Sequence, residues 1–158
     1  MLRYLFSAIL ILTALSIQAR EAESSFVMTQ DRLQDLILQA GSDVIISGNL
    51  VRFTYEGANL LCISDVSADR MRIISPIVDL SEIGVEQLLL ALTANFHTAL
   101  DARYAISDGV MYAVFIHPLG PLSEGEVISA IRQVARARNT FGTDYSSGEL
   151  VFGGVSTP

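Results

Sequence analysis

Residues 103–117 read RYAISDGVMYAVFIH, and this stretch predicts local structure more clearly than any other part of the chain. Asp108-Gly109 is a strong hairpin signal, because both central positions of a type I′ turn need a positive φ. We expect the turn to join strands at 103–107 and 110–117. Residues 110–116 of the second strand are apolar on both faces except for the Tyr112 hydroxyl. This strand should therefore lie in the centre of a sheet or under another subunit.

Further strands are predicted before this hairpin. Residues 43–78 are rich in β-branched and aromatic side chains, with turn residues at short intervals. We expect antiparallel strands at Leu50–Tyr55, Asn59–Asp65 and Arg70–Ile77, with an additional short strand at Val44–Ile46. Pro76 lacks a backbone donor, so its strand should lie at an edge of the sheet or end there.

Three helices are predicted, one before the strands, one between them and one after. In the first helix, Thr29 is the N-cap and Gly41 the C′ residue. The second helix runs from a cap at Ser81 to His97 and is apolar nearly all the way round, so it should be covered on most sides. The third helix begins with a capping box at Ser123.

These elements predict a single α+β domain over residues 29–141. Its antiparallel sheet of about five strands packs with three helices, in the order α-β-β-β-α-β-β-α. Residues 20–28 are polar and show no periodicity, so we expect a flexible lead-in. The glycine-rich residues 142–158 should form a flexible C-terminal segment, with one short strand at 149–152.

The first 19 residues have the pattern of a cleavable signal peptide. Arg3 supplies the positive charge, residues 5–15 form an apolar run, and Ala19 is the small residue before the cut. This run has about half of the roughly 20 residues that a membrane-spanning helix needs. We therefore expect cleavage after Ala19 and a periplasmic or secreted protein. Retention of the segment as a membrane anchor is the alternative.

The composition excludes several kinds of chemistry. The chain has 10 basic residues, all arginine, against 17 acids, and its net charge is −7. This balance argues against nucleic acid and anionic membranes as partners. Without lysine, Schiff-base catalysis and a phosphate-binding P-loop are excluded. The one cysteine, Cys62, excludes an intramolecular disulfide and lies in an apolar stretch, so we expect a buried structural thiol.

No catalytic or metal-binding motif is found in the sequence. His97 and His117 lack a second ligand at the spacing of metal sites. The serine-nucleophile and phosphate-loop motifs are missing. Acid pairs such as Asp65 with Asp69 fall at turns, where carboxylates are favoured for structural reasons. The sequence therefore predicts no catalytic residue, no metal and no cofactor.

Two groups of residues are candidates for binding. Arg132 and Arg136 lie four residues apart on the last helix, close to Arg138. They could hold a carboxylate or an acidic peptide, or could form a solvated face that complements the helix end. The second helix and the strand at 110–116 carry more apolar residues than a small domain easily covers, which is typical of an interface. The apolar candidates are Leu89, Leu92, Phe96, Val110, Tyr112 and Val114.

The order of elements resembles the type III secretion chaperone-like fold and the related bacterial sensory-transduction-regulator family. The resemblance rests on the helix that ends in Ala94-Asn95-Phe96, the hairpin around Asp108-Gly109, and residues 119–126, which lead into the final helix. It covers most of the chain after residue 19. It implies an antiparallel sheet backed by helices, often in a homodimer, that binds extended peptide segments of a client across apolar patches.

Three hypotheses about function follow. The leading one is an exported, non-catalytic, chaperone-like module, dimeric, that holds an extended protein segment or a partner subunit on an apolar surface. The second is a small hydrolase with a site assembled from His117, Asp108 and Ser107. The third is an envelope ligand-binding or sensory regulator with its ligand in a cleft. The expected partner is a protein or peptide, with neither nucleic acid nor membrane after signal cleavage.

Overall fold

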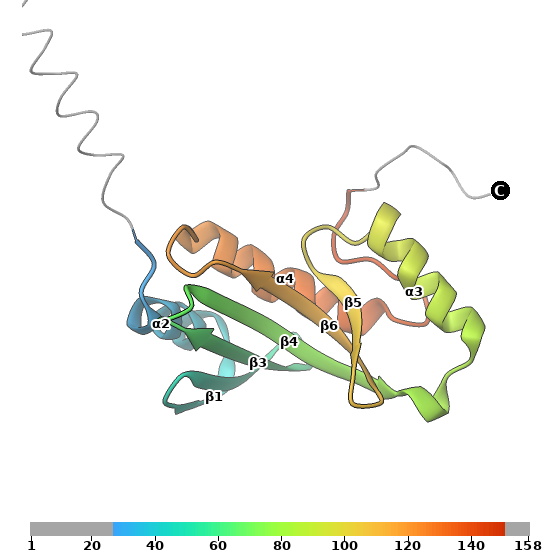
Figure 1. Cartoon of the computed structure of the whole chain (residues 1–158), viewed down its shortest axis with the longest axis horizontal. Helices are drawn as coiled ribbons and strands as arrows, with labels where there is room; N and C mark the ends of the chain where they lie inside the picture. Colours follow the sequence, from blue (N-terminus) through green and yellow to red (C-terminus); the bar gives the residue numbers. More distant parts are fainter. Residues whose placement is uncertain (1–26, 151–158) are drawn as a thin grey trace, which may run out of the picture.

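The computed structural model describes residues 27–150, so the predicted signal peptide lies outside the described residues. Figure 1 shows a sheet with α4 running behind it and with α2 and α3 at opposite ends. The elements in chain order are α2 Gln30–Ala40, β1 Ser42–Ser47, β2 Leu50–Tyr55, β3 Ala58–Asp65, β4 Arg70–Asp79, the 3₁₀ turn η1 Leu80–Glu82, α3 Val85–His97, β5 Arg103–Ser107, β6 Val110–His117 and α4 Glu124–Thr140.

The strands form one antiparallel sheet in the order β1-β2-β3-β4-β6-β5. The predicted α+β class and the order of helices and strands are confirmed for the described residues. The sheet has six strands rather than about five, because the short segment expected at Val44–Ile46 belongs to a full strand, β1, that pairs with β2.

The hairpin of β5 and β6 has the geometry that its sequence predicts. Ser107 pairs with Val110, as a two-residue loop requires. Asp108 and Gly109 have φ values of 49° and 77°, in the left-handed region that both central positions of a type I′ turn need. Because β6 lies between β4 and β5, its predicted central position is confirmed.

The prediction that the strand of Pro76 lies at an edge or ends there is wrong. β4 continues to Asp79 and lies between β3 and β6. Its register pairs with β3 extend only as far as Ile74, and a register shift against β6 follows Pro76. The proline therefore lies where one ladder has ended and the other is irregular, so its missing donor costs little.

One face of the sheet packs against α2 and α4, and we call it the inner face. Along β6, Met111, Ala113 and Phe115 point to this face and are buried, whereas the residues between them are not. They belong to one hydrophobic cluster with buried residues of both helices. Cys62 is 1% exposed within the same cluster, which confirms the predicted burial of its thiol. We call the opposite face of the sheet the outer face.

The second helix begins later than predicted. Residues 80–82 form η1, and α3 starts three residues beyond it. The N-terminus of α3 is capped by Gln87, whose Oε1 accepts a hydrogen bond from the Gly84 backbone N–H at 2.8 Å. Ser81 is therefore not the cap. A long side chain that reaches back from the third helical position replaces it.

The helix ends show one confirmed prediction and one that is wrong. Ser123 N donates to Glu126 Oε2 at 2.7 Å and Glu126 N donates to Ser123 Oγ at 3.2 Å, which is the predicted capping box. Gly41 follows α2, but its φ of −99° is not the left-handed conformation expected of a C′ glycine. Close packing explains this glycine instead, because a Cβ there would lie 2.8 Å from Phe53 Cδ2.

The packed part of the chain extends beyond residues 29–141 at both ends. Met28 is buried, and its N–H donates to Gly120 O at 2.9 Å. Tyr145 is also buried, and its ring lies edge-on to that of Phe141 at 5.2 Å. The start of the segment predicted to be flexible therefore packs on the domain. Residues 149 and 150 are not in a strand, and the rest of the predicted strand lies outside the described residues.

Candidate functional site

An apolar stripe runs along the exposed side of α3. Its four side chains are 72%, 59%, 63% and 77% exposed, in the order Val85, Leu89, Leu92 and Phe96. Spacings of four, three and four residues place them on one side of the helix. We call these four residues the α3 stripe. The prediction that this helix is covered on most sides is wrong for the described residues, because its buried side chains are small alanines.

Three members of the α3 stripe were candidates from the sequence, and Val85 was missed. Its signal was available, because it lies four residues before Leu89 and so on the same side of the helix. The spacing places Val85 beside Leu89 but does not indicate that this side of the helix is exposed, since the whole helix is apolar. The arrangement of buried alanines and exposed large side chains appears only when the helix is placed against the sheet.

A side-chain clamp holds α3 against the end of the sheet. Asn95 Nδ2 donates to Tyr104 O at 3.0 Å, and Tyr104 N donates to Asn95 Oδ1 at 2.7 Å. The Tyr104 ring packs in a group of aromatic rings with Phe141 and Tyr145, at 5.7 and 6.0 Å between centroids. The clamp joins α3 to β5, and the ring group packs around Tyr104 on the β5 side of the clamp.

The three strand candidates lie on a different surface. Val110, Tyr112 and Val114 alternate with the buried residues of β6 and so point to the outer face of the sheet. They are half-buried, in contrast to the α3 stripe. Their role in binding stays a prediction.

The basic cluster is divided between two hollows. Arg132 and Arg136 line a groove of about 490 Å³, together with Glu56 and Glu149. Arg138 lies instead in a separate cleft, where its Nη1 donates to Asn139 Oδ1 at 3.1 Å. Because carboxylates also line the groove, the local charge is mixed. The structure does not single out Arg132 and Arg136 as an anion site.

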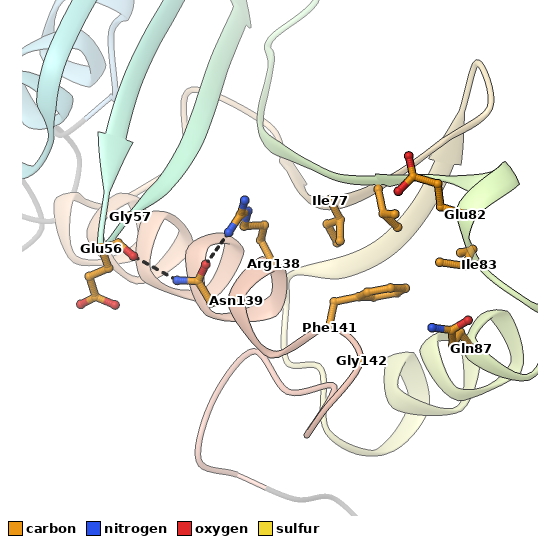
Figure 2. A pocket seen from close by; sticks show the side chains of 11 residues that line it. Glu56, Gly57, Ile77, Glu82, Ile83, Gln87, Arg138, Asn139, Phe141 and Gly142 are labelled. Carbon is orange, nitrogen blue, oxygen red and sulfur yellow. Dashed lines mark hydrogen bonds between the residues drawn. The ribbon is translucent and has the colours of Figure 1, made fainter.

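The cleft that contains Arg138 has a volume of about 720 Å³, and Figure 2 shows its lining. Ile77, Ile83 and Phe141 form an apolar part, and Glu82 and Arg138 bring opposite charges to it. The cleft is wide open to solvent rather than enclosed. It offers neither a closed ligand chamber nor a group of nucleophile, base and oxyanion donors.

The residues of the hydrolase hypothesis are not brought together. Ser107 and Asp108 lie at the β5–β6 turn, whereas His117 pairs with Met71 at the other end of β6. A strand of that length spans about 24 Å. His117 stacks on the Phe115 ring at 5.9 Å between centroids, and its Nδ1 lies 2.8 Å from the Pro118 carbonyl oxygen. Both contacts are local.

Burial makes Cys62 unreactive. It raises the pKa of the thiol to about 12, so the thiolate that acts as nucleophile is not formed near neutral pH. Within residues 27–150, no group of three or more His, Cys, Asp or Glu side chains could hold a metal ion. No helix in this part of the chain is both long and apolar enough to cross a membrane.

Comparison with known proteins identifies the fold but not a family. One chain of a solved structure, described as "Structure of the HopA1-SchA Chaperone-Effector Complex", is similar with a TM-score of 0.54 and 13% sequence identity. The match covers 69% of this chain and 88% of that chain. No family model and no curated protein matches the sequence. The chaperone-like fold expected from the sequence is confirmed, and membership of the sensory-transduction-regulator family is not shown.

Proposed function

We propose that this chain is an exported, non-catalytic, chaperone-like protein-binding module that pairs with a second copy through the α3 stripe. Export rests on the signal-peptide pattern of the first 19 residues, which predicts a periplasmic or secreted product. Binding to proteins rests on the exposed α3 stripe. The fold similarity to a chain of a chaperone–effector complex supports the chaperone-like role.

The observation that carries the proposal is the exposure of four large apolar side chains on one side of α3. Apolar side chains grouped on a surface in this way mark interaction sites. A second copy fits the stripe because a twofold axis brings identical stripes together, and each side chain then counts twice. Helices pack well through residues at spacings of three and four.

The size of the effect can be worked out for two of the side chains. Full burial of a leucine or phenylalanine side chain contributes about 1.5–3 kcal/mol. Leu92 and Phe96 are 63% and 77% exposed, so each would contribute about 1–2 kcal/mol per protomer on burial. Over two protomers, changing both to serine should therefore weaken a dimer by about 4–8 kcal/mol.

The test is the molar mass of the chain expressed with its own leader, measured by size exclusion with light scattering. The processed chain should begin at Arg20 and have the mass of a dimer. The double variant Leu92→Ser/Phe96→Ser should be a monomer with an unchanged far-UV circular dichroism spectrum, and its unfolding midpoint should fall because the stabilisation from pairing is lost. Val66→Ser is the matched control, because Val66 is 64% exposed but lies in the β3–β4 turn. A wild-type monomer, or a double variant that remains dimeric, would refute pairing through this stripe.

A ligand-binding regulator is the second candidate, and the cleft of Figure 2 is the observation that favours it. An anionic ligand there would approach Arg138 across Phe141. Isothermal titration with small carboxylic acids tests this function, and Arg138→Gln should abolish any heat of binding. Binding that survives the substitution would rule out the cleft as the ligand site.

A further inference from the structure

The outer face of the sheet carries two neighbouring rows of aliphatic and arginine side chains. Residues paired across antiparallel strands project from the same face, so the register identifies the members of each row. The first row crosses all six strands and contains Ile45, Arg52, Leu61, Ile74, Val114 and Arg103. The second row contains Ser47, Leu50, Ile63, Arg72 and Ile116. We call the two rows together the arginine–aliphatic face.

This face is accessible. Ile45 and Ile116 are 61% and 60% exposed, and α4 lies behind the sheet when the outer face is viewed (Figure 1). A groove of about 580 Å³ is lined by Ile63, Arg72 and Ile116, and also by Asp65 and Arg70. Aliphatic side chains in this groove therefore lie directly beside a guanidinium group.

The charge of the face is opposite to that of the chain. Its rows contain Arg52, Arg72 and Arg103 and no carboxylate, although acids outnumber arginines by 17 to 10 in the sequence. The acids of β3 and β4 that share this face, Asp65 and Asp79, stand at strand ends. The arginines of the two rows lie on β2, β4 and β5, so the positive charge is spread across the sheet.

Among the described residues, these three guanidinium groups have no carboxylate partner. The ion pair found there joins Arg32 of α2 to Glu124 of α4 at 2.6 Å. The guanidinium groups of Arg52 and Arg72 make no hydrogen bond within residues 27–150. Arg103 Nη1 donates to two backbone carbonyl oxygens at 2.8 and 3.3 Å and keeps other donors. The arginines therefore have donors available for an incoming carboxylate.

We propose that the arginine–aliphatic face binds an extended, acidic protein segment that crosses the strands. Arg52 and Arg103 are four strand spacings apart, which is about 19 Å. In an extended segment, residues six positions apart lie on one side at about 20 Å. Carboxylates at these two positions reach the two arginines, while the apolar side chains between them pack on Leu61, Ile74 and Val114.

The chemistry favours a short acidic segment over other anions. Guanidinium groups bind carboxylates through two parallel hydrogen bonds, and the aliphatic row supplies contact area between them. A nucleic acid or an anionic membrane would in addition be repelled by the net charge of −7 of the chain. The inference rests on the proposed function in that the chain binds proteins, but it concerns a surface other than the α3 stripe.

The test is fluorescence anisotropy with labelled peptides and the processed chain. The probe is Glu-Ser-Val-Ser-Val-Ser-Glu, whose carboxylates have the spacing of Arg52 and Arg103. One control, Glu-Ser-Glu-Ser-Val-Ser-Val, has the same composition with its acids close together, and another has Gln in place of both Glu residues. Arg52→Glu should weaken binding of the probe by about tenfold or more. Arg132→Glu, an exposed arginine on α4, is the matched control and should change it by less than about twofold.

The inference is supported if the probe binds more tightly than both control peptides and if only Arg52→Glu weakens it. It is overturned if the probe does not bind, if the Gln peptide binds equally well, or if Arg132→Glu has the same effect. Binding of phosphatidylglycerol vesicles without binding of the probe would assign the face to a membrane and also overturn it. A monomeric chain that binds the probe as expected would refute pairing through the α3 stripe and leave this inference standing.

Discussion

Replacing Gln133 with methionine should destabilise the fold, because this side chain joins α4 to the segment between α3 and β5. Gln133 Oε1 accepts from the backbone N–H groups of Asp101 and Ala102 at 2.9 and 3.1 Å. Its Nε2 donates to Asp101 Oδ2 at 3.2 Å and to Ser129 Oγ at 3.1 Å. The residue is 7% exposed. Methionine keeps an unbranched side chain of similar length but cannot make these four hydrogen bonds well.

The magnitude follows from the two backbone donors. Ala102 is fully buried, so its N–H would be left without a partner at a cost of about 1–3 kcal/mol. Asp101 is exposed, and water can replace part of its lost hydrogen bond, which leaves about 0.5–1 kcal/mol. The sum is about 1.5–4 kcal/mol, and a gain from the apolar side chain offsets part of it. For a protein of this size, the urea midpoint should fall by about 1–2 M.

Urea unfolding followed by far-UV circular dichroism measures this change. Arg132→Met is the matched control, because Arg132 precedes Gln133 on α4 and is exposed, so its unfolding free energy should stay within about 0.5 kcal/mol of the parent value. Hydrogen exchange should also show faster exchange at the Asp101 and Ala102 amides in Gln133→Met. Equal stability of Gln133→Met and the parent would refute the reasoning, since it would mean that these hydrogen bonds are not needed.

Three further predictions concern the caps, the thiol and one glycine. Ser123→Ala should cost about 1 kcal/mol in urea unfolding at neutral pH. Hydrogen bonds to Ser123 lower the pKa of Glu126. The stabilisation of the fold by these hydrogen bonds is therefore present above the ordinary carboxyl pKa and should be lost as the pH falls through the lowered pKa. Glu126→Gln should remove this pH dependence. Cys62 should react with maleimide only when urea unfolds the chain, as mass spectrometry would show, and fast labelling of the native chain would contradict its burial. Gly41→Ala should lower the unfolding free energy by about 1–3 kcal/mol, because the new methyl group meets the Phe53 ring, and an unchanged midpoint would show that the ring moves aside.

Features encoded by neighbouring residues were predictable from the sequence. The β5–β6 hairpin follows from Asp108-Gly109, a pair that favours the positive φ needed at both central positions of a type I′ turn. The start of α4 follows from Ser123 and Glu126, three positions apart. In both cases, a few adjacent side chains satisfy local backbone groups, so the rest of the fold has little influence on the outcome.

Features that depend on distant segments were not predictable in the same way. A proline lacks a donor, which predicts that the strand of Pro76 lies at an edge or ends there, but a register shift between β4 and β6 makes this proline acceptable in the middle of the sheet. The side of α3 that is exposed depends on where the helix packs, which its uniformly apolar sequence does not determine. The alignment of Arg52 with Arg103 requires the register of five strands, which no local pattern contains.

The Asn95 clamp also limits how the sheet can grow. The backbone N–H and C=O of Tyr104 point away from β6 and are hydrogen-bonded to Asn95. β5 has five residues, and Ile106 is the other one whose backbone groups point away from β6. One residue is too little for a foreign strand to form a ladder at the β5 border. Strand addition is therefore confined to the opposite border, β1. Molecules joined border to border in this way can only form closed pairs, because a filament would need two open borders on every molecule.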